Sequence, residues 1–226
     1  MLLRDSIYQA IRGAILTCEL QPGQELREQV LAERYRVSRS PIRDSLLRLE
    51  QENLITVLPR QGYRVNPISA SDVEDIFGLR LLIEPACAAA AAGAEDEALR
   101  ALDQFRGFST HEQAEAKFYE YNKSFHHAIT VLSGNIRMAA IALDLDEQSQ
   151  RLVQATMHAV DYEQICIACR QHEDMIDALQ AHDAVLASRL AYEHLTYARG
   201  GIEKAMRLVG QRWEEPAKAE PMPVGG

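Results

Sequence analysis

Four polar side chains in the second half of the sequence have the types and spacing needed to bind a divalent metal ion. Asn122 and His126 are four residues apart, so both leave the same face of one predicted helix. His172 and His194 lie on two later predicted helices, and helix bundles build metal sites from side chains of facing helices. Three neutral imidazoles suit Zn²⁺, Ni²⁺ or Cu²⁺. The alternative is that these are unrelated core or surface histidines.

Arg80 is a second candidate, because it lies among apolar residues of a predicted helix, where a guanidinium group needs a partner. Arginine can hold a carboxylate through two hydrogen bonds, which indicates a small acidic ligand. The alternative is an internal ion pair with Glu84, four residues further along the same helix. Tyr121, Arg137 and Arg151 are further candidates for lining the same pocket. Of the remaining histidines, His127 is expected to face elsewhere, and three are expected at the surface: His111, His158 and His182.

The stretch 37–49 has the pattern of the second helix of a helix-turn-helix. Ser40 is a suitable N-cap, and Pro41 would then occupy the first helical position, where its missing N–H costs nothing. An apolar stripe follows at helical spacing, formed by Ile42, Leu46 and Leu49. Arg39 and Arg43 lie at the other edge of the first turn. Arginines at the start of a recognition helix read guanine in the major groove, so this pair is predicted to contact bases.

The elements around this stretch predict a winged helix. Helices are expected at residues 3–19, 27–36 and 41–52, and strands at 54–58 and 63–65. The hairpin tip, Arg60, Gln61 and Gly62, suits the minor groove or phosphates. For Arg27 and Arg48, phosphate contacts and ion pairs within the protein are equally plausible. The full set predicted to contact DNA is Arg27, Ser38, Arg39, Ser40, Pro41, Arg43, Arg48, Arg60, Gln61 and Gly62.

After a short connector the pattern changes to helices only, and a capping box at Ser71-x-x-Glu74 is expected to open the first of them. Helical segments are expected at roughly 71–92, 95–106, 110–133, 135–158, 161–181 and 183–208. The predicted fold is therefore mainly α, a winged helix-turn-helix followed by an all-α bundle of six helices. The predicted domains are 1–67, which binds DNA, and 68–210, which binds an effector and dimerises. The Pro- and Gly-containing tail 211–226 is expected to be disordered.

The charge is divided unevenly between these parts. The net charge of the chain is −9, but residues 1–67 hold ten arginines and eight acidic residues, so the excess of acid lies in the second part. Such asymmetry is typical of a protein that meets DNA at one end only. No apolar run approaches the length of a membrane span, and a cytoplasmic protein is expected.

The sequence resembles the GntR family of bacterial transcription regulators over residues 2–67. The resemblance is carried by Pro22-Gly23, Leu31-Ala32-Glu33, the block Val-Ser-Arg-Ser-Pro-Ile-Arg at 37–43, and Leu46, Leu49 and Gly62-Tyr63. The all-helical part is similar to the ligand-binding domain of the FadR subfamily, in its shorter VanR-like branch. This resemblance implies a divalent metal held by an Asp-x-x-x-His pair and two further histidines. Here the pair reads Asn122-x-x-x-His126, so a weaker neutral donor replaces the carboxylate, and the other ligands would be His172 and His194. It also implies that Arg80 faces the effector.

Together these features predict a homodimeric transcription regulator, most simply a repressor, that binds a palindromic operator in double-stranded DNA. A small carboxylic acid next to a divalent metal, most simply Zn or Ni, would control the affinity for DNA. One alternative is a regulator for which the metal itself is the signal. Another is a metal-dependent hydrolase, for which Glu120 is only a guess at the general base.

Overall fold

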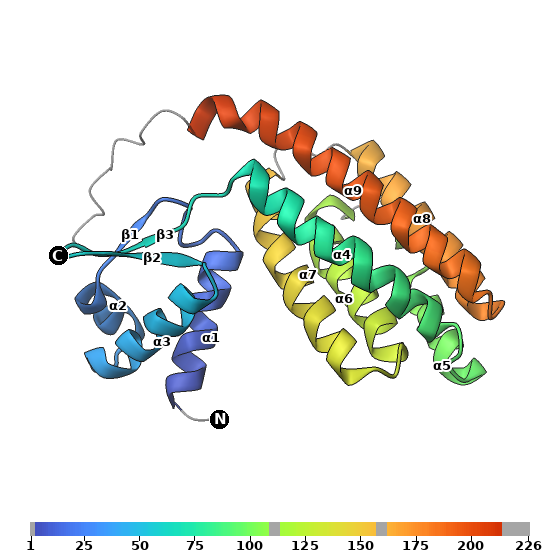
Figure 1. Cartoon of the computed structure of the whole chain (residues 1–226), viewed down its shortest axis with the longest axis horizontal. Coiled ribbons are helices and arrows are strands. Elements are labelled where there is room, and N and C mark those ends of the chain that lie inside the picture. Colours follow the sequence, from blue (N-terminus) through green and yellow to red (C-terminus); the bar gives the residue numbers. More distant parts are fainter. Residues whose placement is uncertain (1–2, 109–113, 157–161, 214–226) are drawn as a thin grey trace.

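The computed structural model describes residues 3–108, 114–156 and 162–213. It has two parts joined by a short connector, a winged-helix head and a helical bundle (Figure 1). The head contains α1 Leu3–Leu16, β1 Glu25–Leu26, α2 Glu28–Tyr35, α3 Arg39–Gln51, β2 Ile55–Leu58 and β3 Gly62–Val65. The bundle contains α4 Ala70–Ala91, α5 Asp96–Arg100, the 3-10 helix η1 Ala101–Phe105, α6 Ala114–Leu132, α7 Ile136–Thr156, α8 Tyr162–Gln180 and α9 Ala184–Trp213. The predicted fold class is confirmed.

The core of the head forms around the predicted stripe of α3, whose three apolar side chains are fully buried against α1. The predicted start of this helix was wrong, because α3 begins at Arg39 with Ser38 as its N-cap. Ser40 and Pro41 therefore lie inside the first turn. No backbone N–H of a first helical turn has a partner within the helix, so proline is tolerated at several positions there and does not mark the start.

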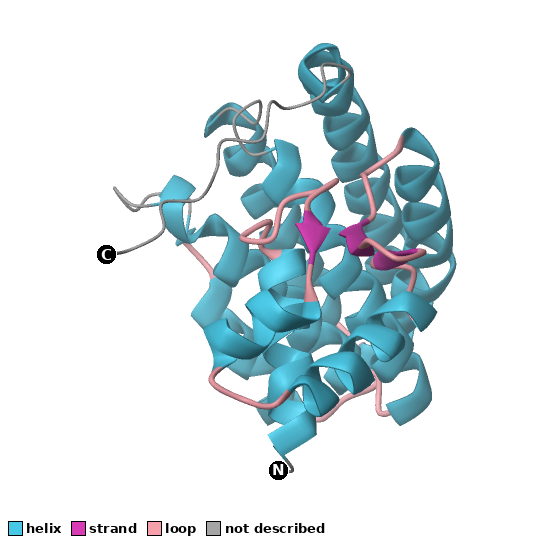
Figure 2. Ribbon diagram, turned by 90° about the vertical axis from the view of Figure 1, so that its left-hand side faces the viewer, coloured by secondary structure: helices cyan, strands magenta, loops and turns pink. Residues whose placement is uncertain are grey.

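The three strands form an antiparallel sheet in the order β1-β3-β2, drawn in magenta in Figure 2. β1 was not predicted, since two residues carry no alternating pattern. Gly62 pairs with Leu58 at the start of β3 and has a positive φ of 116°. A Cβ atom there would lie 2.6 Å from the carbonyl oxygen of Leu26, so glycine is required for β3 to approach β1.

In the bundle, α4 packs against α6, α7 and α9, and the long α9 also packs along α8 (Figure 1). The capping box of α4 is formed by Ser69 and Asp72, two residues before the predicted Ser71 and Glu74. Both pairs have the spacing of a capping box, and the structure uses the one nearer the connector. The predicted tail from Glu214 lies outside the described residues, as do His111 and His158, while residues 211–213 end α9.

Arg12 joins the head to the bundle. Its guanidinium group is buried and pairs with Glu52 at the end of α3 (2.8 Å) and with two carboxylates of α7, Asp144 (2.9 Å) and Glu147. Arg151 of α7 donates to the backbone oxygen of Asn66 in the connector. Helix α7 is therefore the element of the bundle that contacts the head. None of the described helices is long and apolar enough to span a membrane.

Candidate metal and effector site and the DNA-binding face

The three predicted histidine ligands meet in the core of the bundle. His126, His172 and His194 come from α6, α8 and α9, and all three are buried. One ligand atom from each lies within 4.8 Å of the others. The Nε2 atoms of His172 and His194 are 3.2 Å apart. Three helices separated in the sequence thus bring imidazole nitrogens to one point.

The other ring nitrogen of each histidine has a partner of its own. Nδ1 of His126 lies 3.0 Å from Glu84 Oε2, and Nδ1 of His194 lies 2.9 Å from the amide oxygen of Gln171. Nδ1 of His172 lies 3.2 Å from the hydroxyl of Tyr121. Carboxylate and amide oxygens accept, so His126 and His194 donate through Nδ1 and keep a lone pair on Nε2. This is the arrangement that orients a metal-ligating histidine.

Burial disfavours the charged form of two of the three histidines. It lowers the pKa of His172 and His194 well below the ordinary histidine value, and the neighbouring rings lower it further. Neutral imidazole is the form that binds a metal. Two nitrogens bound to Zn²⁺ at about 2.0–2.1 Å in tetrahedral geometry lie roughly 3.3 Å apart, close to the observed separation of the two Nε2 atoms. The donor set therefore fits a divalent metal, and Asn122 lines the cavity beside His126 and His194.

Arg80 is also buried in this region, between α4 and α7. It pairs with Glu84, lies 3.3 Å from Asp146, and donates to the hydroxyl of Ser149 at 2.8 Å. Burial alone would raise the pKa of Glu84, but Arg80 and the hydrogen bond from His126 outweigh it and lower the pKa to about 2. Burial raises the pKa of Asp146 despite the nearby Arg80. The internal pair with Glu84 is thus present, and Arg80 is held mainly by that carboxylate.

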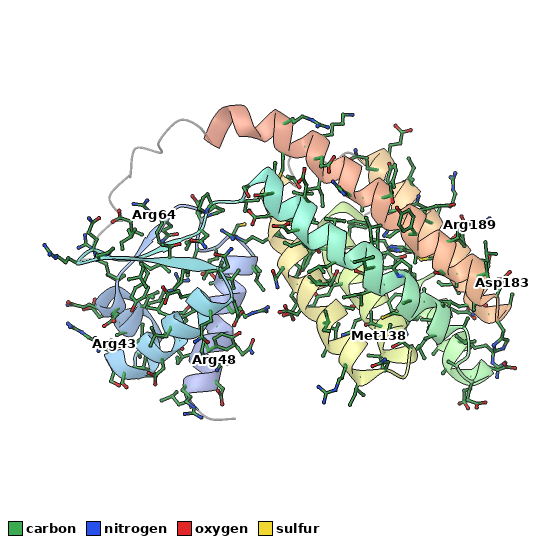
Figure 3. The ribbon with its side chains drawn as sticks, in the orientation of Figure 1. Arg43, Arg48, Arg64, Met138, Asp183 and Arg189 are labelled. Atoms are coloured by element: carbon green, nitrogen blue, oxygen red, sulfur yellow. The ribbon has the colours of Figure 1, made fainter. Side chains whose placement is uncertain are left out.

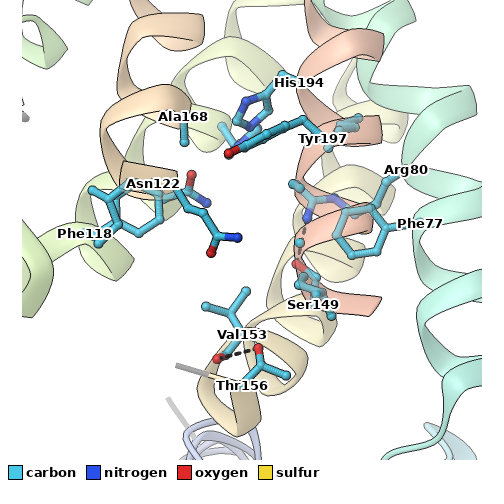
Figure 4. A pocket seen from close by; sticks show the side chains of 17 residues that line it. Phe77, Arg80, Phe118, Asn122, Ser149, Val153, Thr156, Ala168, His194 and Tyr197 are labelled. Carbon is cyan, nitrogen blue, oxygen red and sulfur yellow. Dashed lines mark hydrogen bonds between the residues drawn. The ribbon is translucent and has the colours of Figure 1, made fainter. Parts of the chain in front are cut away.

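One nitrogen of Arg80 stays available to a ligand. Among the residues that the structure describes, its Nη2 has no hydrogen-bond partner, because the contact with Asp146 lacks hydrogen-bond geometry. Arg80 lines a cavity of about 100 Å³ together with Asn122, His126, His194 and Ser149 (Figure 4). Buried polar groups are normally satisfied, so an unpaired N–H at a cavity indicates a missing acceptor.

Three other predicted pocket residues do not line this cavity. Tyr121 is buried in an aromatic cluster, where it stacks on Phe108 and contacts His172. Tyr121 therefore contacts the predicted ligand His172 and is not part of the cavity wall. Arg137 is exposed near the start of α7, and Arg151 is engaged at the connector. Of the remaining histidines, His127 is exposed, and His182 is an exposed residue that bonds Asp96 and the backbone of Ala92.

Arg43, predicted to contact bases, lies at the outer edge of the head, on the side away from the bundle (Figure 3). Arg43 makes two hydrogen bonds of 2.9 Å to Glu28 of α2, which lower the pKa of that carboxyl. Arg39 donates to Gln29 at 3.1 Å. Both arginines are exposed, and their partners belong to the first helix of the helix-turn-helix.

The other predicted DNA contacts divide into two groups. Five are exposed on the head: Arg27, Ser38, Ser40, Arg60 and Gln61. The rest have structural roles. Pro41 is half-buried in the first turn of α3, and Gly62 is required by the strand pairing. Arg48 lies over the ring of Tyr8 at 3.6 Å and pairs with Asp5, which ties α3 to α1.

Comparison with known proteins identifies the family to which this architecture belongs. Residues 3–65 match the family described as bacterial regulatory proteins, gntR family, and residues 75–197 match the FCD domain. The chain belongs to the GntR family, in its FCD-containing, FadR-like subfamily. It is therefore a transcription regulator with a DNA-binding head and an effector-binding domain. The hydrolase alternative is dropped, because this is a family of regulators and not of enzymes.

Curated GntR relatives align along most of their length. The HTH-type transcriptional repressor RspR of Escherichia coli (strain K12) is 28% identical over 201 residues, which cover 85% of this chain and 86% of the relative. The HTH-type transcriptional repressor GlaR of the same organism is 28% identical over 210 residues, covering 88% and 95%. The solved structure of E. coli McbR/YncC has the same fold, with a TM-score of 0.74 at 20% identity, covering 94% of this chain and 99% of that one.

Several residues of this GntR regulator's sites were missed at the sequence level. Glu28 carries no signal of its own, since it is one of two acids on a short helix. Gln171 directly precedes His172 yet bonds His194, a pairing that only the packing of α8 on α9 creates. Asp146 reaches Arg80 from another helix.

Proposed function

We propose that this GntR regulator is a repressor whose affinity for its operator is controlled by a small carboxylic acid, bound beside a divalent metal in the bundle. Repression is supported by two relatives named as repressors, which align with most of this chain. The observation that carries the metal is the convergence of three buried histidines, each with its second nitrogen already engaged.

His126, His172 and His194 would hold the metal, with Asn122 as a weaker oxygen donor. Imidazole ligands favour Zn²⁺ or Ni²⁺ over Mg²⁺ or Ca²⁺. When bound, the metal supplies positive charge and an open position for a carboxylate oxygen. Arg80 lines the same cavity, and its Nη2, which has no hydrogen-bond partner among the described residues, would donate to the other carboxylate oxygen.

A signal from this cavity has a direct physical route to the head through α7. This helix places Asp146 and Ser149 against Arg80, and it places Asp144 and Glu147 against Arg12 of α1. A ligand changes DNA affinity only if it prefers one arrangement of the head on the bundle. We infer that the acid acts on α7 through Arg80, and that the Arg12 contacts transmit the change.

A homodimer on a palindromic operator completes the proposal. Apolar side chains on the outer face of α4 and at the start of α7 support a partner surface: Leu79, Leu82 and Ile136 are 49%, 74% and 84% exposed. Grouped exposed apolar residues mark interaction sites more often than free surface. Sedimentation of the parent and of Leu82→Glu tests this, and a monomeric parent would contradict it.

The central test is an operator titration with four arms. The operator is first selected from random duplex DNA by the protein itself. The protein is purified without chelator or affinity tag, and its metal is then removed by a chelator. The operator is titrated with this apo-protein alone, with added Zn²⁺, with benzoate, and with both. Release only when both are present supports the proposal. Release by Zn²⁺ alone would favour the metal-responsive alternative, and equal affinity in all arms would contradict both.

A further inference from the structure

The walls of the cavity point to a particular class of acid. We propose that the effector is a monocarboxylate with an apolar body, and that acids with a second charged group away from the first are excluded. This inference rests on the proposed function, because it assumes that a carboxylate binds beside the metal and Arg80. It narrows the ligand from any small acid to one chemical type.

The polar end of the cavity accepts one carboxylate. The charge of Arg80 is already matched by Glu84, with Asp146 as a second carboxylate on the same guanidinium group. An imidazole binds a metal through its uncharged form, so the divalent ion would supply the positive charge that attracts an anion. Only one nitrogen of Arg80 is left to donate. This set of donors holds a single anionic head group.

The rest of the cavity is apolar. Away from Arg80 and the histidines it is lined mainly by Phe77, Phe118, Val153, Ile165, Leu195 and Ile202. Figure 4 shows Phe118 and Phe77 on opposite sides of the space, Arg80 beside Phe77, and His194 across the space from Val153. No Lys or Arg other than Arg80 is among the lining residues that the structure describes. A carboxylate buried against this wall would lose its hydration without gaining a partner, which is strongly unfavourable.

The uncharged polar lining residues do not change this conclusion. Asn122, Thr156, Gln164 and Tyr197 are uncharged and can bond a hydroxyl or amide, but they supply no cation for a second carboxylate.

The volume of the cavity sets the size of the ligand. A water-sized group needs roughly 10–15 Å³ of such space, so a cavity of about 100 Å³ holds a ligand of roughly seven to ten non-hydrogen atoms.

The test compares three compounds of equal size on the full-length, Zn²⁺-loaded protein by calorimetry. Benzoate, benzamide and glutarate have the same number of non-hydrogen atoms and differ in charge and polarity. Benzoate is expected to bind at least about 100-fold more tightly than glutarate, because the second carboxylate has no partner. Benzamide is expected to bind at least about 10-fold more weakly than benzoate, because it lacks the charge that the metal and Arg80 recognise.

A wall variant reverses the preference. Val153→Lys places a cation opposite the polar end, so it is expected to weaken benzoate and to strengthen glutarate at least about 10-fold. Ile141→Lys is the matched control, since it makes the same kind of change on an exposed position of the same helix. The control is expected to leave both affinities unchanged. The comparison of compounds on the parent protein stands by itself if the wall variant does not fold.

The outcomes separate this inference from the function on which it rests. Glutarate binding as tightly as benzoate would overturn the apolar, singly charged effector while leaving an acid-controlled regulator in place. Benzamide binding as tightly as benzoate would overturn recognition of the charge. If none of the three binds and the operator titration shows no release by benzoate, the carboxylate effector itself fails, and this inference fails with it.

Discussion

Two arginines that the sequence marks as ligand-facing have opposite surroundings. Arg43 in the head pairs with Glu28, and its side chain is 62% exposed. Arg80 in the bundle pairs with Glu84, and its side chain is 5% exposed. Exposed ion pairs contribute little to stability, because water stabilises each separated charge almost as well as its partner does. Buried ion pairs are costly to break, because the charge that remains is neither paired nor hydrated.

The difference indicates how each arginine works. Arg43 can exchange Glu28 for a base edge or a phosphate at little cost, so its pair is compatible with a role in DNA binding. Arg80 cannot leave Glu84 for a ligand, and it offers only its one unpaired nitrogen. In the head we expect DNA to replace the ion pair, whereas in the bundle the pair would be part of the wall against which a ligand binds.

The largest effect is expected from removing the buried cation. Arg80→Met leaves the carboxylates of Glu84 and Asp146 buried without it, so the free energy of unfolding should fall by about 3–5 kcal/mol, measured by urea denaturation. Arg189→Met is the control, because Arg189 is an exposed residue of α9 (Figure 3), and it should change stability little. An equally small change in Arg80→Met would mean that the pair is not buried in solution.

Metal binding should stabilise the bundle by somewhat less. Zn²⁺ at 100 times its dissociation constant should add about 2.7 kcal/mol to the free energy of unfolding, seen as a higher melting temperature. His194→Ala should abolish this response, since it removes one of three buried ligands. His182→Ala should keep it, because that histidine is exposed and bonds Asp96. A response in both variants, or in neither, would contradict the histidine site.

The sequence was most informative where contacts are local. The stripe of α3, the arginines of its first turn and the i, i+4 pair of Arg80 with Glu84 are all fixed by helical spacing. Apart from the three histidines, which the family resemblance brought together, contacts made by packing distant helices could not be predicted, and these include Asp146 beside Arg80 and Gln171 beside His194. The rotation of each helix in the bundle also decides that Tyr121 contacts His172 and that Arg137 lies outside the cavity.

In the head, Arg43→Ala should weaken operator binding roughly 10- to 100-fold at fixed salt, measured by fluorescence anisotropy. If Arg43 reads a base, the loss is larger for the operator than for random DNA, because phosphate contacts are shared by both. Arg100→Ala in α5 is the control and should leave both affinities unchanged, since this residue lies exposed in the bundle. Equal weakening on operator and random DNA would assign Arg43 to the phosphate backbone.

The junction between the two regions should affect coupling more than binding. Arg12→Gln removes the cation that Glu52, Asp144 and Glu147 share, so the head is no longer tied to α7. The change in operator affinity caused by benzoate with Zn²⁺ should shrink toward none, from the roughly 5- to 150-fold typical of coupled sites. Operator affinity without benzoate should change less. Undiminished release in this variant would show that the signal travels by another route.

The smallest effect tests whether Glu28 competes with DNA or assists it. Glu28→Gln keeps the shape of the side chain but removes the charge that holds Arg43. If DNA replaces Glu28, the variant should bind operator about 2- to 5-fold more tightly, with a similar gain on random DNA, because an exposed ion pair costs little to give up. If Glu28→Gln instead weakens operator binding as Arg43→Ala does, Glu28 holds Arg43 in its base-reading position within the complex. The contrast with Arg80 would then lie in solvent exposure alone, since both arginines would work while paired.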